Sequence, residues 1–307
     1  MTDFRWACPL CHTPLTALDA VRLHCPADDL IFECRAGIWR FLTPDREAHY
    51  AQFMREYQQV REAEGRGSID DAYYRALPFA DLSGRFTADW SIRARSFSTF
   101  IQKVLQPLER AAQRPLFILD LGAGNGWLSY RLAQRGHQVA AIDLLTNPQD
   151  GLGAHVHYDA IFTPVQAEFD RLPFADAQID LAIFNASLHY AVSYETTLCE
   201  ALRVLRPDGQ IVILDSPLYR SGESGAQMVR EREAAFTQRF GFPSNALPSE
   251  NYLTQACLHD LAESLHLRWQ IIQPFYGWRW HLRPLIAWLR GRREPARFAV
   301  MVGQRWT

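Results

Sequence analysis

The segment Leu116-Phe117-Ile118-Leu119-Asp120-Leu121-Gly122-Ala123-Gly124-Asn125-Gly126 is the most informative part of this 307-residue chain. Its first six residues, apolar except for one carboxylate, predict a short buried strand, and the alternate glycines after them predict a tight turn. Residues 127–134 then have the pattern of a helix. A turn with few side chains lets a ligand approach the backbone, and the first turn of a helix offers free N–H groups. We therefore expect a ligand at this strand–turn–helix junction.

Strands and helices continue to alternate on the C-terminal side of the junction. We expect further strands at residues 138–143, 165–168, 179–184 and 210–215, and a helix at 194–205. Such alternation through short turns is typical of a parallel sheet. Two strands near the C-terminus bring the expected total to seven: 268–275 and 297–304. The sequence thus predicts an α/β fold, Rossmann-like and doubly wound, with a mostly parallel seven-stranded sheet.

The expected second strand ends in Asp143, at the same edge of the sheet as the glycine turn. A carboxylate in that position can accept hydrogen bonds from both hydroxyl groups of a ribose. The glycines have the spacing G-x-G-x-G, at Gly122, Gly124 and Gly126, whereas dinucleotide-binding folds have G-x-G-x-x-G. We therefore expect a nucleoside ligand other than a dinucleotide.

The glycine spacing resembles the first motif of class I S-adenosylmethionine-dependent methyltransferases, of the type-11-like kind, whose turn wraps an amino-acid moiety. The resemblance runs in order and spacing over residues 116–215, and includes the stretch 168–174, the turn Ser187-Leu188-His189-Tyr190 and the helix and turn at 202–209. Glu168 stands where aspartate is usual in the family. Asn185-Ala186-Ser187 lacks the Pro-Pro-aromatic motif of the enzymes that methylate amino groups of nucleic acids.

The resemblance implies that the chain binds S-adenosyl-L-methionine. It places the amino-acid moiety of the cofactor at the glycine turn, the ribose at Asp143 and the adenine amino group at Glu168. The residues expected to contact the cofactor lie in the turn and after the strands: Asp120, Gly122, Ala123, Gly124, Asn125, Gly126, Asp143, Leu144, Glu168, Phe169 and Asn185.

His189, Tyr190 and Asp215 are the candidate catalytic residues, because they follow expected strands at the edge where α/β sites form. Methyl transfer from a sulfonium is an in-line displacement, and it needs a base only if the acceptor must first lose a proton. Since histidine titrates near neutrality, His189 is a candidate base or substrate-orienting group. The alternative is that His189 only packs against the cofactor or a helix. Asp215 has the alternative role of capping the segment that follows it.

Four of the six cysteines lie within the first 34 residues. Cys8 and Cys11 form a C-x2-C pair, and Cys25 and Cys34 complete a candidate set of four ligands for a tetrahedral zinc ion. The segment also resembles the short zinc-ribbon-like segment in front of some bacterial methyltransferases. Asp28 lies near the place where that segment has its fourth ligand, and is the alternative to Cys34. Packed free thiols are the alternative to zinc.

The composition of the chain suggests three parts. Residues 1–43 are expected to be a small zinc-ribbon-like module, 44–113 a helical lid or linker, and 114–307 the methyltransferase domain, with an insertion at about 216–250. Three aromatic residues of the helical part are candidates for contact with the acceptor, the alternative being ordinary core packing: Tyr57, Tyr73 and Trp90.

Residues 278–293 combine tryptophans and aliphatic residues with arginines. Two interpretations are open for this segment. It touches a membrane surface or an anionic substrate, or it is a helix that packs its apolar side on the sheet while its arginines face water.

The net charge of -2 gives no general attraction to nucleic acid. Together with the long insertion, it favours a closed pocket and methyl transfer to a small-molecule or lipid-like acceptor. An RNA methyltransferase of the rRNA type is the alternative suggested by the zinc-ribbon-like module, and a non-catalytic cofactor-binding partner protein is the third. Because no apolar leader and no membrane-spanning run is visible, we expect a cytoplasmic protein.

Overall fold

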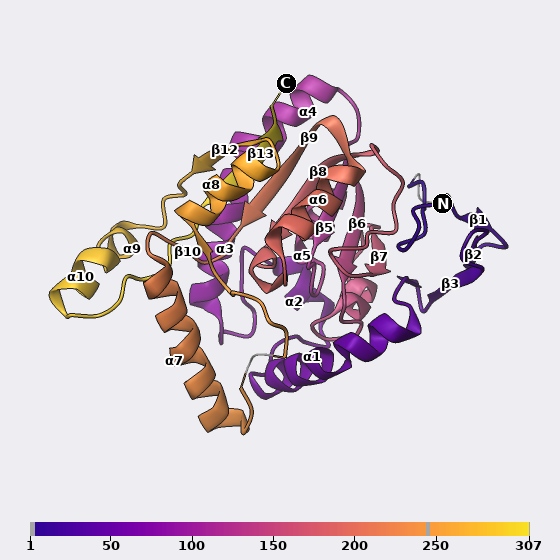
Figure 1. Ribbon diagram of the computed structural model, residues 1–307. Coiled ribbons are helices and arrows are strands. Elements are labelled where there is room, and N and C mark those ends of the chain that lie inside the picture. The colour runs from indigo at the N-terminus through magenta and orange to yellow at the C-terminus, as the bar shows by residue number, and fades with distance from the viewer. Residues whose placement is uncertain (1–3, 244–245, 307) are drawn as a thin grey trace.

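The computed structural model describes residues 4–243 and 246–306, and a large sheet runs through it (Figure 1). Seven strands form the central part of this sheet, in the order β7 (Thr163–Gln166), β6 (Gln138–Asp143), β5 (Phe117–Leu121), β8 (Ile179–Asn185), β9 (Leu205–Leu214), β13 (Val300–Arg305) and β12 (Leu267–Ile272). All neighbouring pairs from β7 to β9 are parallel, and only β13 runs against its neighbours. The prediction of a mostly parallel, doubly wound α/β fold is confirmed, and the seven expected strands form the central part of a larger sheet.

The order of the strands reverses at β5. From β5 the chain adds β6 and β7 on one side, and it then crosses over to add β8 and β9 on the other side. At such a switch point the connections leave in opposite directions, and a crevice opens at the carboxyl ends of the two central strands. The glycine turn after β5 and the turn after β8 therefore lie at the same crevice.

Side chains alternate along the strands and build a separate core on each face of the sheet. In β5, Ile118 belongs to one core and Leu119 to the other. Helices α6 (Tyr194–Val204) and α8 (Gln255–Ser264) cover one face. The other face is covered by α2 (Asp71–Ala76), α3 (Thr87–Phe100) with its π-helical continuation at Ile101–Leu105, α4 (Gln106–Ala112) and α5 (Trp127–Ala133). Burial on both faces explains why the strands are apolar runs.

Residues 16–40 extend this sheet instead of standing apart from it. They form β1 (Thr16–Ala17), β2 (Arg22–Cys25), β3 (Leu30–Arg35) and β4 (Ile38–Arg40), which pair with one another in antiparallel order. Strand β4 then pairs in parallel with β7, where Trp39 lies opposite Val165. The sheet consequently has eleven strands among the described residues.

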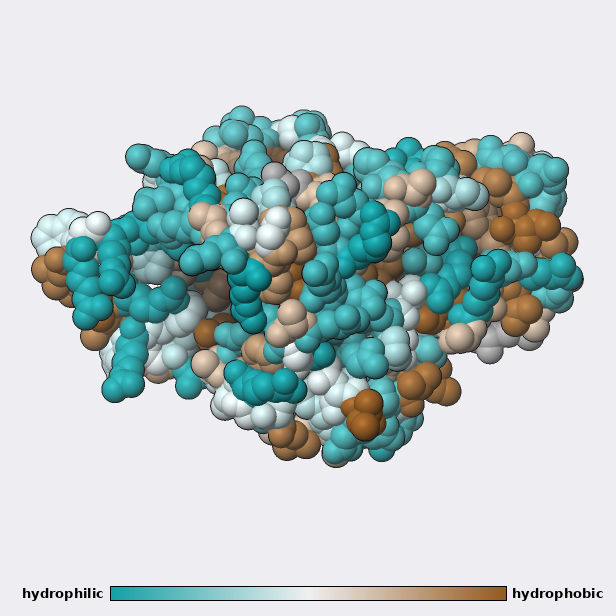
Figure 2. Space-filling model, turned by 90° about the horizontal axis from the view of Figure 1, so that it is seen from below, coloured by the Kyte–Doolittle hydropathy of each residue, from teal (hydrophilic) through white to brown (hydrophobic). Residues whose placement is uncertain are grey.

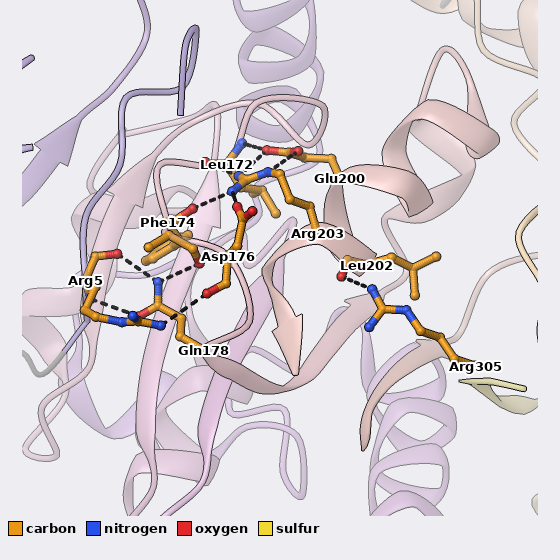
Figure 3. A network of polar contacts seen from close by, with 10 residues as sticks. Arg5, Leu172, Phe174, Asp176, Gln178, Glu200, Leu202, Arg203 and Arg305 are labelled. Atoms are coloured by element: carbon orange, nitrogen blue, oxygen red, sulfur yellow. Dashed lines mark hydrogen bonds and ion pairs between the residues drawn. The ribbon is translucent and has the colours of Figure 1, made fainter. Parts of the chain in front are cut away.

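Polar contacts also fasten the N-terminal segment to the loop between β7 and β8 (Figure 3). The backbone N–H of Arg5 donates to the side-chain oxygen of Gln178 at 2.9 Å, and the Arg5 guanidinium donates to the carbonyl of Asp176 at 3.1 Å. Arg203 of α6 binds the same loop, donating to the carbonyl of Phe174 at 2.8 Å and to the Asp176 carboxylate at 2.6 Å. One loop thus joins the N-terminal strands to a helix of the main sheet.

Two long helices border the carboxyl edge of the sheet, where Figure 1 shows them below the strands. They are α1 (Pro44–Ala63) and α7 (Gly222–Phe240). Helix α7 fills most of the expected insertion, whose base is closed by the parallel pairing of β10 (Leu218–Tyr219) with β11 (Leu253–Thr254). Two 3-10 turns, Leu152–His157 and Leu188–Tyr190, complete the connections at this edge.

The C-terminal basic and aromatic segment projects from the body of the protein as α9 (Trp278–His281) and α10 (Arg283–Leu289) (Figure 1). No residue of either helix is buried, and the side chains of Trp278 and Trp288 are 76% and 74% exposed. The interpretation that this segment packs its apolar side on the sheet is therefore wrong. In the described part of the chain, we find no helix with the length and apolar character needed to cross a bilayer.

Candidate active site

A cavity of about 320 Å3 lies at the carboxyl ends of β5, β6 and β8. It brings together nine of the residues expected at the cofactor: Gly122, Ala123, Gly124, Asn125, Asp143, Leu144, Glu168, Phe169 and Asn185. The three candidate catalytic residues line the same cavity: His189, Tyr190 and Asp215. Asp120 and Gly126, also expected at the cofactor, are not lining residues. The cavity thus unites segments that are far apart in the sequence, since its lining runs from Tyr50 to Phe298.

The glycine turn has a backbone shape that only glycine adopts without strain at its ends. Gly122 has φ +80°, and a Cβ added to it would lie 2.3 Å from the Cβ of Ser187. Gly126 has φ +81° at the first residue before α5, and an added Cβ would lie 2.8 Å from the ring of Phe162. Contacts this short exclude any other residue. Packing of the turns after β5 and β8 therefore explains two of the three glycines.

Asp143 holds the glycine turn in place from the end of β6. One oxygen of its carboxylate accepts a hydrogen bond from the N–H of Gly124 at 2.8 Å, and the other accepts one from the N–H of Leu145 at 2.8 Å. Burial raises the pKa of Asp143 above its usual value, and the two backbone donors oppose that shift. Since a carboxylate has about four acceptor positions, two remain for a ligand in the cavity.

Asp120 lies under the turn rather than at the cavity. It is completely buried, and one of its oxygens accepts a hydrogen bond from the hydroxyl of Ser129 in α5 at 2.8 Å. The other oxygen has no partner among the described residues. Burial raises the pKa of Asp120 to about 7. The contact with Ser129 positions the start of α5 relative to β5.

Glu168, expected to meet the adenine amino group, is engaged by helix α1. Arg46 donates to both of its oxygens, at 2.9 and 2.6 Å, and the hydroxyl of Tyr50 donates at 2.8 Å. The carboxylate is only 4% exposed. In this arrangement Glu168 fastens α1 over the cavity, and Asp170 is a second acid in the lining.

A second ion pair fastens the other end of α1. The guanidinium of Arg61 donates to both carboxylate oxygens of Asp150, and both residues line the cavity. Sequence reasoning missed this pair, because its members are 89 residues apart and Asp150 lies in a loop without a recognisable pattern. An arginine and an acid in a chain rich in both give no signal before the fold brings them together.

His189 is buried at the end of β8, and its Nδ1 lies 3.4 Å from the hydroxyl of Ser216. Burial and, to a smaller extent, the nearby charges of Arg232 and Arg93 together lower the pKa of His189 to about 3. The imidazole is therefore neutral near pH 7, with a lone pair available to accept a proton or a hydrogen bond.

The ring of Tyr190 lies next to this imidazole, with centroids 4.3 Å apart, and Asp215 lines the same cavity. The Asp215 carboxylate accepts a short hydrogen bond from the hydroxyl of Ser96 in α3, and its other oxygen has no partner among the described residues. Burial raises the pKa of Asp215. The ring of Tyr190 meets that of Tyr57 edge to face, with centroids 6.1 Å apart.

The aromatic candidates of the helical part divide between cavity and core. Tyr57 and Trp90 line the cavity. Tyr73 is buried in the core beside Tyr74 instead. Tyr219, at the carboxyl edge after β9, lies near Arg293, outside the cavity lining.

A group of possible metal ligands lies in the N-terminal strands, away from the cavity. One ligand atom from each of four residues lies within 4.8 Å of the others: Cys8, Cys11, Cys25 and Asp28. The sulfurs of Cys11 and Cys25 are 3.5 Å apart, and the Cys8 sulfur is 3.0 Å from an Asp28 oxygen. Tetrahedral zinc with bonds of about 2.3 Å separates its sulfur ligands by roughly 3.8 Å, which is close to these spacings. Asp28 belongs to the group and Cys34 does not.

Comparison with known proteins finds matches in the central sheet. Residues 119–213 match the family model described as a methyltransferase domain. A malonyl-[acyl-carrier protein] O-methyltransferase of Erwinia pyrifoliae is 32% identical over 128 residues, covering 39% of this chain and 46% of the relative. An uncharacterized methyltransferase of Mycobacterium bovis is 34% identical over 168 residues, covering 51% and 66%. The chain thus spans less than half of the first relative and about two thirds of the second.

Solved structures with a similar fold include an N1-methyltransferase of Burkholderia thailandensis with bound 1,6-didemethyltoxoflavin and S-adenosylhomocysteine. It has a TM-score of 0.48 and 17% sequence identity, and the match covers 95% of this chain and 99% of that chain. The YcgJ protein of Bacillus subtilis has a TM-score of 0.44 and 15% identity, with 63% and 93% covered.

Proposed function

We propose that this protein, which carries a class I S-adenosylmethionine-dependent methyltransferase domain, transfers a methyl group from S-adenosylmethionine to a small-molecule or lipid-like acceptor. The observation that carries the proposal is the cavity in which the glycine turn and Asp143 lie side by side, joined by the hydrogen bond from Gly124. A backbone turn without side chains suits the amino-acid moiety of the cofactor, and the free acceptor positions of Asp143 suit its ribose hydroxyls.

The two ion pairs of helix α1 support a closed reaction site. With Arg46 and Arg61 held by Glu168 and Asp150, the aromatic side of α1 faces the cavity through Tyr50, among others. Exclusion of water from the reacting atoms strengthens electrostatic interactions and prevents hydrolysis. A cavity of this size beneath helix α1 fits a small acceptor better than a nucleotide within a folded RNA.

The reaction itself asks little of the protein beyond positioning. The acceptor atom forms a bond to the methyl carbon while the bond from that carbon to sulfur breaks, and its electron pair stays on sulfur to give S-adenosylhomocysteine. If the acceptor carries a proton, the neutral imidazole of His189 can take it. Tyr190 and Asp215, beside His189 in the cavity lining, are the other groups that can orient the acceptor.

We also propose that Cys8, Cys11, Cys25 and Asp28 bind a zinc ion with a structural role. Three thiols and one carboxylate form a donor set that suits zinc. The group lies at the end of the sheet opposite β12, in strands that pair with the central sheet through β4. In this proposal the ion stabilises the N-terminal module of residues 1–43, and residues 44–113 act as the lid of the domain at 114–307.

Methyl transfer is tested with S-adenosylmethionine labelled in its methyl group. The protein is incubated with a bacterial metabolite extract, with total lipid and with total RNA, and label is measured in each fraction. We expect label in the metabolite or lipid fraction and none with D143A. Label in RNA alone would establish the RNA methyltransferase alternative. Binding of the cofactor without label in any fraction would favour the non-catalytic alternative.

A further inference from the structure

Two arginines reach the acceptor side of the cavity from different helices. Arg93 of α3 lines the main cavity together with His189 and Asp215. Arg232 of α7 lines an adjoining cavity of about 310 Å3, to which Arg93 and Tyr190 also contribute. The two cavities therefore adjoin at Arg93 and Tyr190, and no residue of the glycine turn lines the second one.

These two arginines differ from Arg61 and Arg66 in forming no ion pair among the described residues. Arg93 nevertheless lies near enough to the Asp215 carboxylate for its charge to oppose the rise that burial causes in the pKa of that group. Arg61 is paired with Asp150 and Arg66 with Glu64. Among the residues that the structure describes, neither Arg93 nor Arg232 forms an ion pair, and Nε and Nη2 of Arg232 are buried without a hydrogen-bond partner. The Arg93 guanidinium lies over the ring of Trp90, 5.3 Å from its centre.

Both side chains are partly buried, and the two unpaired nitrogens of Arg232 are fully so. A buried N–H group of a cation without a hydrogen-bond partner is unfavourable, because nothing replaces the water that it has lost. A guanidinium has five N–H donors in a planar arrangement that matches a carboxylate or a phosphate. The natural partner of two such groups at one cavity is an anion that enters with a ligand. Both guanidinium groups lie near His189, and their charges add to the effect of burial in lowering the pKa of its imidazole.

We infer that the acceptor carries an anionic group, a carboxylate or a phosphate, which Arg232 and Arg93 bind while the atom to be methylated lies toward His189. This inference rests on the proposed function and narrows it to anionic acceptors. The bound anion also offsets the two positive charges next to His189, so that the imidazole becomes a stronger base only when the acceptor is present. The arginines thus select the acceptor and prepare the site for it.

Small anions of graded chemistry test the inference without knowledge of the acceptor. Benzoate, phenyl phosphate and the neutral benzamide are titrated by calorimetry into the full chain, both with and without S-adenosylhomocysteine. We expect benzoate or phenyl phosphate to bind at least ten times more tightly than benzamide. The preferred anion distinguishes a carboxylate from a phosphate acceptor.

The matched variants are R232Q and R230Q, which change neighbouring arginines of the same helix, Arg230 being exposed. We expect R232Q to weaken anion binding at least tenfold while the Kd for S-adenosylhomocysteine stays within twofold, and R230Q to change neither. Equal binding of benzamide and the anions, or equal behaviour of the two variants, would overturn the inference. Failure of the wild type to bind S-adenosylhomocysteine would instead overturn the proposed function. The anion titrations done without S-adenosylhomocysteine would still test the role of the arginines.

The projecting helices α9 and α10 independently carry a second inference. Large apolar side chains along them are exposed: Trp278, Leu282, Leu285, Ile286, Trp288 and Leu289. Residues 264–293 contain no aspartate or glutamate, whereas they contain six arginines. Figure 2 shows hydrophobic and hydrophilic side chains intermingled at the left end of the molecule, where Figure 1 places these helices.

We propose that α9 and α10 bind the surface of an anionic lipid bilayer. Tryptophan and leucine side chains enter the interface between headgroups and acyl chains, and arginines attract the negative headgroups. The charge of the segment decides between partners, because an apolar surface made to bind a second copy of this chain would place like charges together. Arg279, Arg290 and Arg292 are exposed and form no ion pair among the described residues, so they are free for this contact.

Sedimentation with vesicles tests this surface. The full chain is mixed with vesicles of phosphatidylcholine alone, or with one quarter phosphatidylglycerol. We expect binding to the anionic vesicles only, weaker at higher salt, and at least a fivefold loss in the double variant W278A/W288A. The variant W306A, which removes an exposed tryptophan elsewhere, is the control. Absence of vesicle binding, or a dimer that W278A/W288A dissociates, would overturn the proposal.

Discussion

Asp143 has two roles. Its carboxylate anchors the glycine turn through hydrogen bonds, and it keeps further hydrogen-bond acceptor positions free toward the cavity. Replacement by alanine removes the carboxylate that accepts hydrogen bonds from Gly124 and Leu145 and, in the proposed complex, from the ribose hydroxyls. A hydrogen bond to a charged group is worth about 1.5–3 kcal/mol. We expect D143A to weaken S-adenosylhomocysteine binding by at least 100-fold in calorimetry, and D143N, which keeps one acceptor, to have an intermediate effect. Unchanged affinity in D143A would show that this carboxylate does not contact the cofactor.

His189 makes the stability of the protein depend on pH. Its pKa is about 3 in the folded state and about 6.5 when exposed, so the unfolded state binds the additional proton between these values. The free energy of unfolding should therefore fall as the pH drops below 6.5, with a slope of up to about 1.4 kcal/mol per pH unit from this group. Urea unfolding of the wild type and H189Q at pH 7.5, 6 and 5 measures the difference. Parallel slopes in the two proteins would contradict the burial of a neutral imidazole.

At the scale of residues, the sequence was informative where a local pattern carries the chemistry. The glycine turn and Asp143 could be predicted because spacing alone identifies a turn and the end of a strand. The partners of Arg61 and Glu168 could not be predicted, because each contact joins segments about 90 to 120 residues apart. Glu168 is assigned to the cofactor because of its position at the end of the third expected strand. That position does not reveal that Arg46 and Tyr50 of α1 donate hydrogen bonds to its carboxylate.

Helix α1 is held over the cavity chiefly by its two ion pairs, and its own sequence has little amphipathic character to replace them. In R61Q the buried carboxylate of Asp150 has no cationic partner, which weakens the attachment of α1 and lets the helix open more often. We therefore expect the Kd for S-adenosylhomocysteine to rise about tenfold. Hydrogen exchange should be faster in the amides of α1 in this variant. The control R55Q changes an exposed arginine of the same helix. Equal exchange rates in the two variants would count against α1 as a lid.

The N-terminal strands are expected to hold one zinc ion per chain. Because Cys11 belongs to the ligand group and Cys34 does not, C11S should lose the metal and C34S should retain it. Elemental analysis of the purified proteins measures the zinc content, and thermal unfolding shows whether its loss lowers the Tm. Metal loss in both C11S and C34S would replace Asp28 by Cys34 as the fourth ligand, and metal retention in C11S would contradict the ligand group itself.

At the scale of the whole molecule, the central strands could be predicted, whereas the attachment of the N-terminal strands and the exposure of α9 and α10 could not. Alternating strands and helices specify the seven central strands, because each connection is local and its handedness is restricted. The pairing of β4 with β7 joins residues 126 positions apart, such as Trp39 and Val165, and nothing in either strand specifies its neighbour. The exposure of α9 and α10 could not be predicted either, because a helix packed on a sheet has the same pattern of apolar residues.

The central claim is that the cavity at the carboxyl ends of β5 and β6 binds the methyl donor. A crystal structure of the protein grown or soaked with S-adenosylhomocysteine tests it most directly. We expect electron density for the amino-acid moiety along residues 122–126 and for the ribose hydroxyls within hydrogen-bonding distance of the Asp143 carboxylate. Density for the nucleoside at another place on the protein, or an unliganded cavity at saturating concentration, would contradict the account.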